Sequence, residues 1–207
     1  EKVVLFRELQ HRVANSLQIV ASVLMQNARK VQSNETRAHL SDAHNRVMSI
    51  AALQKQLAAS GEDTVALRPY FTQLCETIGA SMIRDPRQIH LDVTGDDSRV
   101  KSDISVSLGL VVTELVINAL KHAFPDDRYG KVAVDYRSTG PEWALTVADD
   151  GAGMEPEAGL GTSIVNALAK HLQAEVVVTH NSPGTTVSLI HAPADSDGIE
   201  AQLEVAV

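Results

Sequence analysis

A strongly apolar stretch, residues 104–124, carries three polar residues at four-residue steps: Glu114, Asn118 and His122. In an α-helix, steps of four residues drift by only about 40° each, so the three polar side chains share one face. Apolar side chains fill the rest of this helix: Leu108, Val111, Val112, Leu115 and Val116. A buried carboxylate or amide needs a partner. The row therefore predicts a functional site on a helix that otherwise belongs to the core.

The 207 residues suffice for one large domain, or for a small domain with a helical appendage. The net charge of −8 argues against nucleic acid or an anionic membrane as the main partner. The lone Cys75 excludes an intramolecular disulfide and fits a reducing compartment. We find no apolar stretch of membrane-spanning length and no signal-peptide pattern, so we expect a cytoplasmic protein without direct membrane contact.

Residues 1–61 predict a hairpin of two amphipathic helices, because the segment has no proline and its apolar residues recur at three- and four-residue steps. The first helix has an apolar stripe of Leu5, Leu9, Val13, Leu17, Val20 and Leu24. Its polar side carries Arg7, His11, Asn15, Gln18 and Ser22. We expect Asn34 to cap the second helix and Ser60-Gly61 to end it. A hairpin with this much apolar surface tends to pair with a second copy as a four-helix bundle.

Residues 64–193 predict an α+β sandwich, in which helices cover one mostly antiparallel sheet. After a linker at 61–64, helices are expected at 67–83, 104–124 and 163–172. Strands are expected at 89–93, 131–137, 143–148, 175–180 and 185–191. The acidic tail, residues 194–207, has weak periodicity, and its structure is left open.

Three glycine-containing motifs follow the polar row: Asp149-x-Gly151-x-Gly153, then Gly159-Leu160-Gly161, then Gly184-Thr185-Thr186. Taken alone, the first is a common tight turn, and a structural role is favoured by roughly four to one. A lone Gly-x-Gly before a helix is equally weak. The order of the motifs between helices and strands is far more specific than any one of them.

In this order the motifs resemble those of the GHKL ATPases, and the resemblance covers roughly residues 64–192. It implies an ATP pocket with magnesium, in which Asn118 is the metal ligand. Lys121 and His122 would offset phosphate charge. Glu114 would orient or deprotonate a magnesium-bound water.

The same resemblance assigns the glycine motifs. The Asp149 carboxylate would accept a hydrogen bond from the adenine amine, with Gly151 and Gly153 allowing close approach. The Thr185 hydroxyl would help fix Asp149 and a water against the base. Phosphate oxygens would lie at the start of the following helix, on Gly159, Gly161, Thr162 and Ser163.

The segment Glu8-Leu9-Gln10-His11-Arg12-Val13-x-Asn15 resembles the phosphoacceptor helix of bacterial sensor histidine kinases of the HisKA-type-2 class, relatives of the HWE kinases. A histidine on the polar face of a bundle helix can take a phosphoryl group. Alone, His11 would more often be a surface residue, by roughly three to one. Asn15 lies one turn further on and could orient water. The strict HWE signature is absent, because Leu145 stands two residues after Trp143.

These resemblances imply the catalytic core of a two-component sensor histidine kinase. It would phosphorylate His11 from ATP, pass the group to an aspartate of a response-regulator receiver domain, act as a homodimer, and could also have phosphatase activity. One alternative is a non-autophosphorylating histidine phosphotransfer or phosphatase protein that keeps the fold. Another is an anti-sigma-type serine kinase. The other histidines show no metal-ligand spacing and are interpreted as structural or surface residues: His39, His44, His90, His171, His180 and His191.

Overall fold

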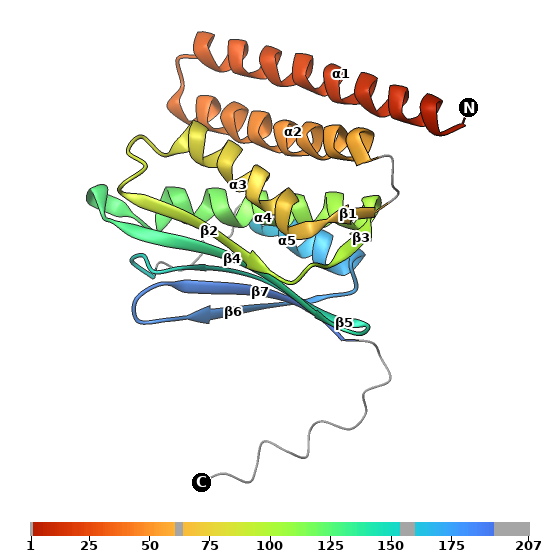
Figure 1. Ribbon diagram of the computed structural model, residues 1–207. Helices are drawn as coiled ribbons and strands as arrows, with labels where there is room; N and C mark the ends of the chain where they lie inside the picture. Colours follow the sequence, from red (N-terminus) through yellow and green to blue (C-terminus); the bar gives the residue numbers. More distant parts are fainter. Residues whose placement is uncertain (1, 61–63, 154–159, 193–207) are drawn as a thin grey trace, which may run out of the picture.

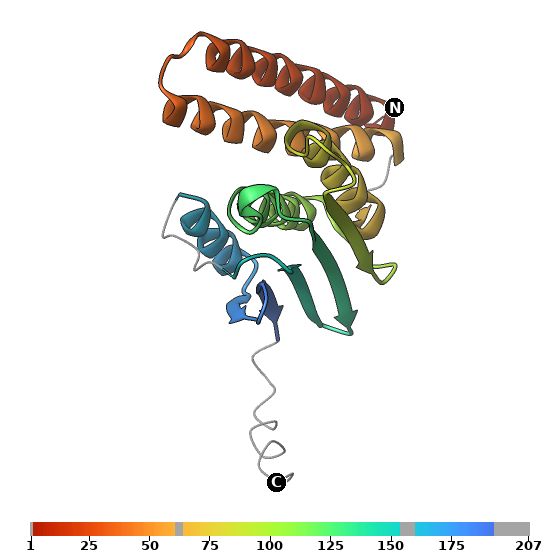
Figure 2. The same cartoon turned by 90° about the vertical axis from the view of Figure 1, so that its left-hand side faces the viewer.

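The computed structural model describes residues 2–60, 64–153 and 160–192 (Figure 1). A helical hairpin lies on one side of a layer of helices, and the main sheet lies on the other side (Figures 1 and 2). The expected α+β class, with a helical hairpin followed by a helix-and-sheet domain, is confirmed. Most of the linker at 61–64, Gly159 and the acidic tail lie outside the described residues.

The hairpin consists of α1, Lys2–Lys30, and α2, Asn34–Ser60, running antiparallel. Three buried alanines at seven-residue steps, Ala14, Ala21 and Ala28, lie along α1. Small side chains let helices approach closely. Val13 and Val20 of the apolar stripe are 46% and 48% exposed, because the alanines of α1 occupy its buried face. The hairpin alone therefore leaves part of the stripe uncovered.

The turn between the two helices is fixed by side chains. Ser33, rather than Asn34, caps α2, because its Oγ accepts a hydrogen bond from the Thr36 N–H at 3.3 Å. The Arg37 guanidinium donates to the Val31 carbonyl oxygen at 2.8 Å and to Asn34 Oδ1 at 3.2 Å. These bonds satisfy groups that the ends of the two helices would otherwise leave unpaired.

The main sheet has the strand order β2-β4-β5-β7-β6. Its strands are β2 (Ile89–Gly95), β4 (Gly130–Thr139), β5 (Glu142–Asp149), β6 (Glu175–His180) and β7 (Thr185–His191). Only β2 and β4 pair in parallel, so the expectation of a mostly antiparallel sheet is confirmed. A second sheet was not expected: β1, Thr64–Ala66, pairs with β3, Arg99–Lys101. Strands of three residues are too short to show an alternating pattern.

Three helices cover one face of the main sheet (Figures 1 and 2). They are α3 (Leu67–Met82), α4 (Ser102–His122) and α5 (Leu160–His171), and a short 3₁₀ turn, η1 (Pro125–Asp127), follows α4. Helix α5 begins three residues earlier than expected. The core between the helices and the sheet is made mainly by Tyr70, Phe71, Leu74, Leu108, Val111, Val112, Val132, Val134, Leu145 and Leu189.

Helix α4 is the central element of this core. With 21 residues it is long and apolar enough to span a membrane by length and composition, contrary to the expectation that no such stretch exists. However, 56% of its most apolar window is buried inside the domain. The core helix of a globular domain has the same composition, so its apolar character is explained by packing against α3, α5 and the sheet.

The close contact between α3 and α4 predicts opposite effects for two Gly→Ala substitutions. At Gly109 of α4 an added β-carbon would overlap the ring and hydroxyl of the buried Tyr70. We expect Gly109→Ala to lower the free energy of unfolding by about 1–3 kcal/mol, despite the better helix propensity of alanine. The measurement is urea unfolding.

Gly79→Ala in α3 is the matched control. There the β-carbon would lie 3.2 Å from Leu91 Cδ1, the end of a side chain that can shift, and helix propensity should make the change neutral or stabilising. Equal loss of stability in both variants would contradict the packing described here.

Candidate functional site

The polar row on α4 runs from buried to exposed. Glu114 is 2% exposed, Asn118 is half-buried, and His122 is exposed at the end of the helix. The side-chain amide of Asn118 forms no hydrogen bond with any described residue. The three side chains thus lead from the core towards the surface, as the four-residue spacing predicts.

Glu114 has a partner that the sequence did not suggest. The guanidinium of Arg46, on α2, binds both carboxylate oxygens: Nη2 donates to Oε2 at 2.8 Å, and Nε donates to Oε1. The hydrogen bond to Glu114 is the largest cause that raises the pKa of Arg46 above its ordinary value. A buried carboxylate is tolerated only when its charge is compensated. The bidentate pair therefore explains how the core accepts Glu114.

A second ion pair joins the same two helices. The Lys121 ammonium lies 2.6 Å and 2.7 Å from the two carboxylate oxygens of Asp42 on α2. Sequence reasoning assigned roles to Lys121 and Glu114 but missed Asp42 and Arg46. The available signal was their spacing, because opposite charges four residues apart share one helix face.

The Asp149–Gly153 turn lies against the end of α4. Gly151 leaves no room for a side chain, because a β-carbon there would overlap the Ala123 carbonyl group. The Ala152 N–H donates to the Ala123 carbonyl oxygen at 2.8 Å. The structure thus brings together the two motifs that sequence reasoning assigned to one pocket.

Asp149 ends β5 and pairs with Thr185, the first residue of β7. Its Oδ1 accepts a hydrogen bond from the Gly151 N–H at 3.0 Å, and Thr185 is buried beside it. Burial raises the pKa of Asp149, and the N–H groups of Gly151 and Thr185 oppose this shift in part. The carboxylate is therefore fixed in direction but poorly solvated, which suits it to accept a hydrogen bond from a ligand.

The remaining predicted phosphate residues lie at the start of α5. Gly161, Thr162 and Ser163 belong to the first turn of this helix. Gly159 lies outside the described residues, and so does the segment 154–158 that links the two glycine motifs. Gly153, with φ +68°, adopts the left-handed conformation that favours glycine.

No group of three or more His, Cys, Asp or Glu side chains in the described ranges could hold a metal ion by itself. An Asn118 amide oxygen is a suitable ligand for a hard cation, but one such oxygen does not make a site. The residues present therefore fit a cation that is shared with a bound phosphate group.

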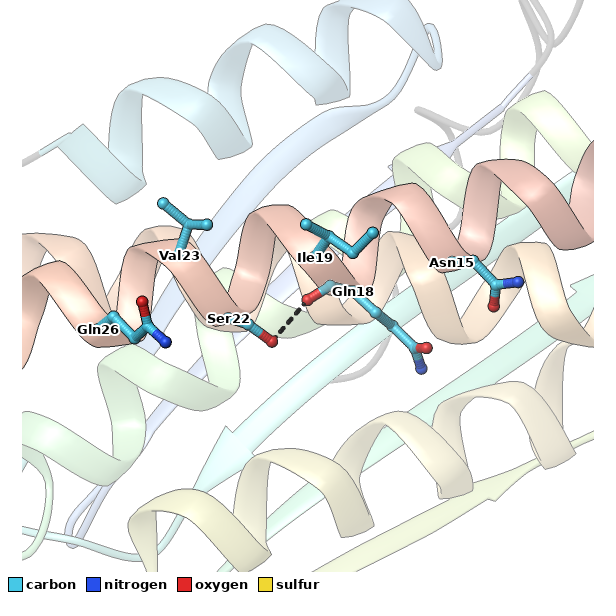
Figure 3. A pocket seen from close by; sticks show the side chains of 6 residues that line it. All are labelled: Asn15, Gln18, Ile19, Ser22, Val23 and Gln26. Atoms are coloured by element: carbon cyan, nitrogen blue, oxygen red, sulfur yellow. Dashed lines mark hydrogen bonds between the residues drawn. The ribbon is translucent and has the colours of Figure 1, made fainter.

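His11 and Asn15 are both exposed on α1. Glu8 and Arg12 flank His11 and form an ion pair, with Arg12 Nη2 at 2.8 Å from Glu8 Oε1. A shallow, open depression on α1 begins one turn past His11 (Figure 3). It is lined by Asn15, Gln18, Ile19, Ser22, Val23 and Gln26. Helix α1 packs on α2, and α2 lies between α1 and the sheet domain (Figure 2). The structure therefore does not bring His11 to the polar row of α4.

Two family models match the chain. A model described as histidine kinase matches residues 8–82. A model described as histidine kinase-, DNA gyrase B- and HSP90-like ATPase matches residues 103–196. Together they cover the hairpin and most of the sheet domain.

Similar proteins carry the same domains. The sensor histidine kinase PdtaS of Mycobacterium tuberculosis is 34% identical over 78% of this chain and 34% of its own length. Blue-light-activated histidine kinase 2 of Erythrobacter litoralis is 29% identical over 88% of this chain and 55% of its own. The chain therefore spans only a third to about half of these relatives.

Among solved structures, the histidine kinase domain of the Erythrobacter litoralis EL346 blue-light-activated histidine kinase has a TM-score of 0.66 and 26% identity. The match covers 84% of this chain and 94% of that domain. The Acinetobacter baumannii histidine kinase AdeS, at 11% identity and a TM-score of 0.52, shares the fold.

The raised pKa of Asp149 predicts how stability changes in Asp149→Asn. In the wild type, ionisation is less favourable in the folded state than in the unfolded chain, so stability falls as pH rises through the folded pKa. Asparagine keeps an oxygen for the Gly151 N–H and removes the buried charge. We expect the variant to unfold at higher denaturant than the wild type at pH 7. Below the unfolded pKa of about 3.8 the difference should vanish.

Denaturant titrations at pH 7 and at pH 3 measure this change. Asp85→Asn is the control, because Asp85 is exposed at the surface and its Arg87 hydrogen bonds lower its pKa. If Asp149→Asn were less stable than the wild type at pH 7, burial of the ionised carboxylate would not be destabilising, and the prediction would be wrong.

Proposed function

Because this chain belongs to the histidine kinases with a GHKL-type ATPase domain, we propose that it transfers the γ-phosphoryl group of ATP to His11. From His11 the group would pass to an aspartate of a response-regulator receiver domain. The observation that carries the proposal is the contact between the Asp149–Gly153 turn and the end of α4, in a chain that also exposes His11. We place this reaction in the cytoplasm.

The adenine side of the site is assigned to Asp149. Its carboxylate accepts a hydrogen bond from the exocyclic amine of adenine, whereas guanine has a carbonyl group at that position and leaves the carboxylate unpaired. Thr185 lies beside Asp149 in the sheet, and its hydroxyl helps fix the carboxylate and a water. The glycines of the turn let the base approach the backbone.

The phosphate side is assigned to α4 and the start of α5. Asn118 would hold the magnesium ion, which would neutralise charge on the triphosphate. Lys121 and His122 would offset further negative charge, and Glu114 would orient water near the metal. The first-turn N–H groups of α5, at Gly161, Thr162 and Ser163, hold phosphate oxygens together with Gly159.

The phosphoacceptor is His11. In its neutral form one ring nitrogen attacks the γ-phosphorus, the bond from phosphorus to the β,γ-bridging oxygen breaks, and ADP leaves. Attack on phosphorus by a receiver aspartate then restores the histidine. Asn15, one turn further along α1, is placed to orient a water that removes phosphate from the partner, which would give the same helix a phosphatase role.

Partners of the hairpin are indicated by exposed apolar side chains. Ile19 is 66% exposed, and Val13, Val20 and Val23 are close to half exposed on the same helix. A helix in a closed hairpin normally buries such residues. They support pairing with a second copy of the chain as a four-helix bundle.

Two alternatives have separate tests. A protein that only relays or removes phosphate would bind ATP weakly or not at all, whereas the proposed kinase binds it in a manner that depends on Asp149. A serine kinase of the anti-sigma type would yield an acid-stable product, whereas phosphohistidine is acid-labile.

Incubation with ATP labelled in the γ-phosphoryl group tests the proposal. His11→Ala should retain nucleotide binding and lose all acid-labile label, because the acceptor nitrogen is gone. Asn118→Ala should also lose label, but through a fall in affinity for magnesium-ATP of at least about tenfold, measured by calorimetry.

His39→Ala is the matched control, because His39 is another exposed histidine of the hairpin. It should be labelled like the wild type. Persistent label on His11→Ala would exclude His11 as the acceptor.

A further inference from the structure

We propose that Asp42 and Arg46 form a charge latch, which holds the hairpin against the phosphate side of the candidate ATP site and opens when nucleotide binds. The inference rests on the proposed function, because it needs Glu114 and Lys121 to serve a bound nucleotide. The proposal assigns a role in the ATP site to two residues of α2. These residues belong to the predicted phosphotransfer hairpin and are far from the residues of the ATP site in sequence.

The latch joins two charges on α2 to two charges on α4. Asp42 and Arg46 are one turn apart on α2, and Glu114 and Lys121 are two turns apart on α4. The acid of α2 meets the base of α4, and the base of α2 meets the acid of α4. The Arg46 and Glu114 side chains are 22% and 3% exposed, and the Lys121 and Asp42 side chains are more open, at 30% and 19%. Charges in such surroundings are screened by salt less than surface charges are.

The latched charges are the ones that the nucleotide needs. Both oxygens of Glu114 accept hydrogen bonds from Arg46 and the residue is 2% exposed, so Arg46 competes with any metal-bound water for this carboxylate. The Lys121 ammonium contacts both oxygens of Asp42, so its charge is already neutralised before any phosphate arrives. A triphosphate that draws on Lys121 must therefore displace Asp42.

The position of His11 gives an independent reason for the latch to open. With the hairpin docked, α2 separates α1 from α4, and His11 is on the far helix (Figure 1). Phosphorylation of His11 requires the hairpin to move, or a second copy to supply the histidine. Opening of the two ion pairs frees α2 and at the same time frees Glu114 and Lys121.

Reciprocity makes the latch measurable. If nucleotide weakens docking of α2 by some factor, then docking weakens nucleotide binding by the same factor. Asp42→Asn removes one latch pair and leaves α4 unchanged. We expect it to bind magnesium-ATP about three- to tenfold more tightly than the wild type, which is the size expected of one partly buried pair. Glu35→Gln is the control, because it removes the same charge from an exposed position of α2.

A distance measurement separates the latch from a general change in charge. Spin labels on Gln32→Cys, in the hairpin turn, and on Tyr129→Cys, which is 70% exposed after α4, report the docking of the hairpin. Cys75 is buried and its thiol has a pKa raised to about 12, so it should not take up label. The expected result is one narrow distance distribution without nucleotide and a broader distribution with non-hydrolysable magnesium-ATP. Asp42→Asn should show the broader distribution without nucleotide.

The possible results distinguish failure of the latch from failure of the proposed function. If the nucleotide binds and the distance stays fixed, the latch is excluded while the proposed ATP site survives. If Glu35→Gln tightens binding as much as Asp42→Asn, the effect is one of net charge, and the latch is again excluded. If neither the wild type nor the variants bind nucleotide, the proposed function fails, and the latch fails with it.

Discussion

The carboxylate of Glu114 is the constraint around which the two parts of the chain are joined. It lies at 2% exposure on the most apolar helix of the molecule, where an uncompensated charge would cost several kcal/mol. Compensation comes from Arg46, which belongs to the hairpin and not to the sheet domain. Compensation of the Glu114 charge therefore depends on the docking of α2. In this way one buried carboxylate of the sheet domain favours a fixed position of the hairpin.

Most elements of the sheet domain could be predicted, because each of them produces a pattern over five residues or more, whereas β1 and β3 span three residues each and were not expected. The row at Glu114, Asn118 and His122 and the turn at Asp149 were also visible, since both are local in sequence. The order of the motifs led us to expect that they lie side by side, and the hydrogen bond between Ala152 and Ala123, which was not foreseen, joins them in the structure. The roles assigned to individual site residues stay predictions, because the structure shows where they lie and not what they bind.

The sequence did not predict contacts between residues that are far apart along the chain. Arg46 and Glu114 are 68 positions apart, and neither residue shows its partner by periodicity. The alanine seam of α1 was missed for another reason. Alanine contributes little to an apolar pattern, so the stripe was traced through the larger leucines and valines. In the structure, three alanines occupy the buried face of α1, and two valines of the stripe are exposed.

The chemistry of the α2 interface also bears on how the two parts of a kinase can separate. Its buried residues on α2 include Asn45 and Ser49 as well as Ala51, and Ser81 of α3 donates to Asn45 Oδ1 at a long 3.5 Å. An interface of large apolar side chains would respond little to a charged ligand, because burial of apolar surface is insensitive to added phosphate. An interface held by Asp42 and Arg46 responds directly, because a triphosphate competes for the same charges on α4. A hairpin docked in this way is held in place without nucleotide and is released when nucleotide binds. Such release is needed if a nucleotide bound at α4 is to react with His11 on α1 of the same chain.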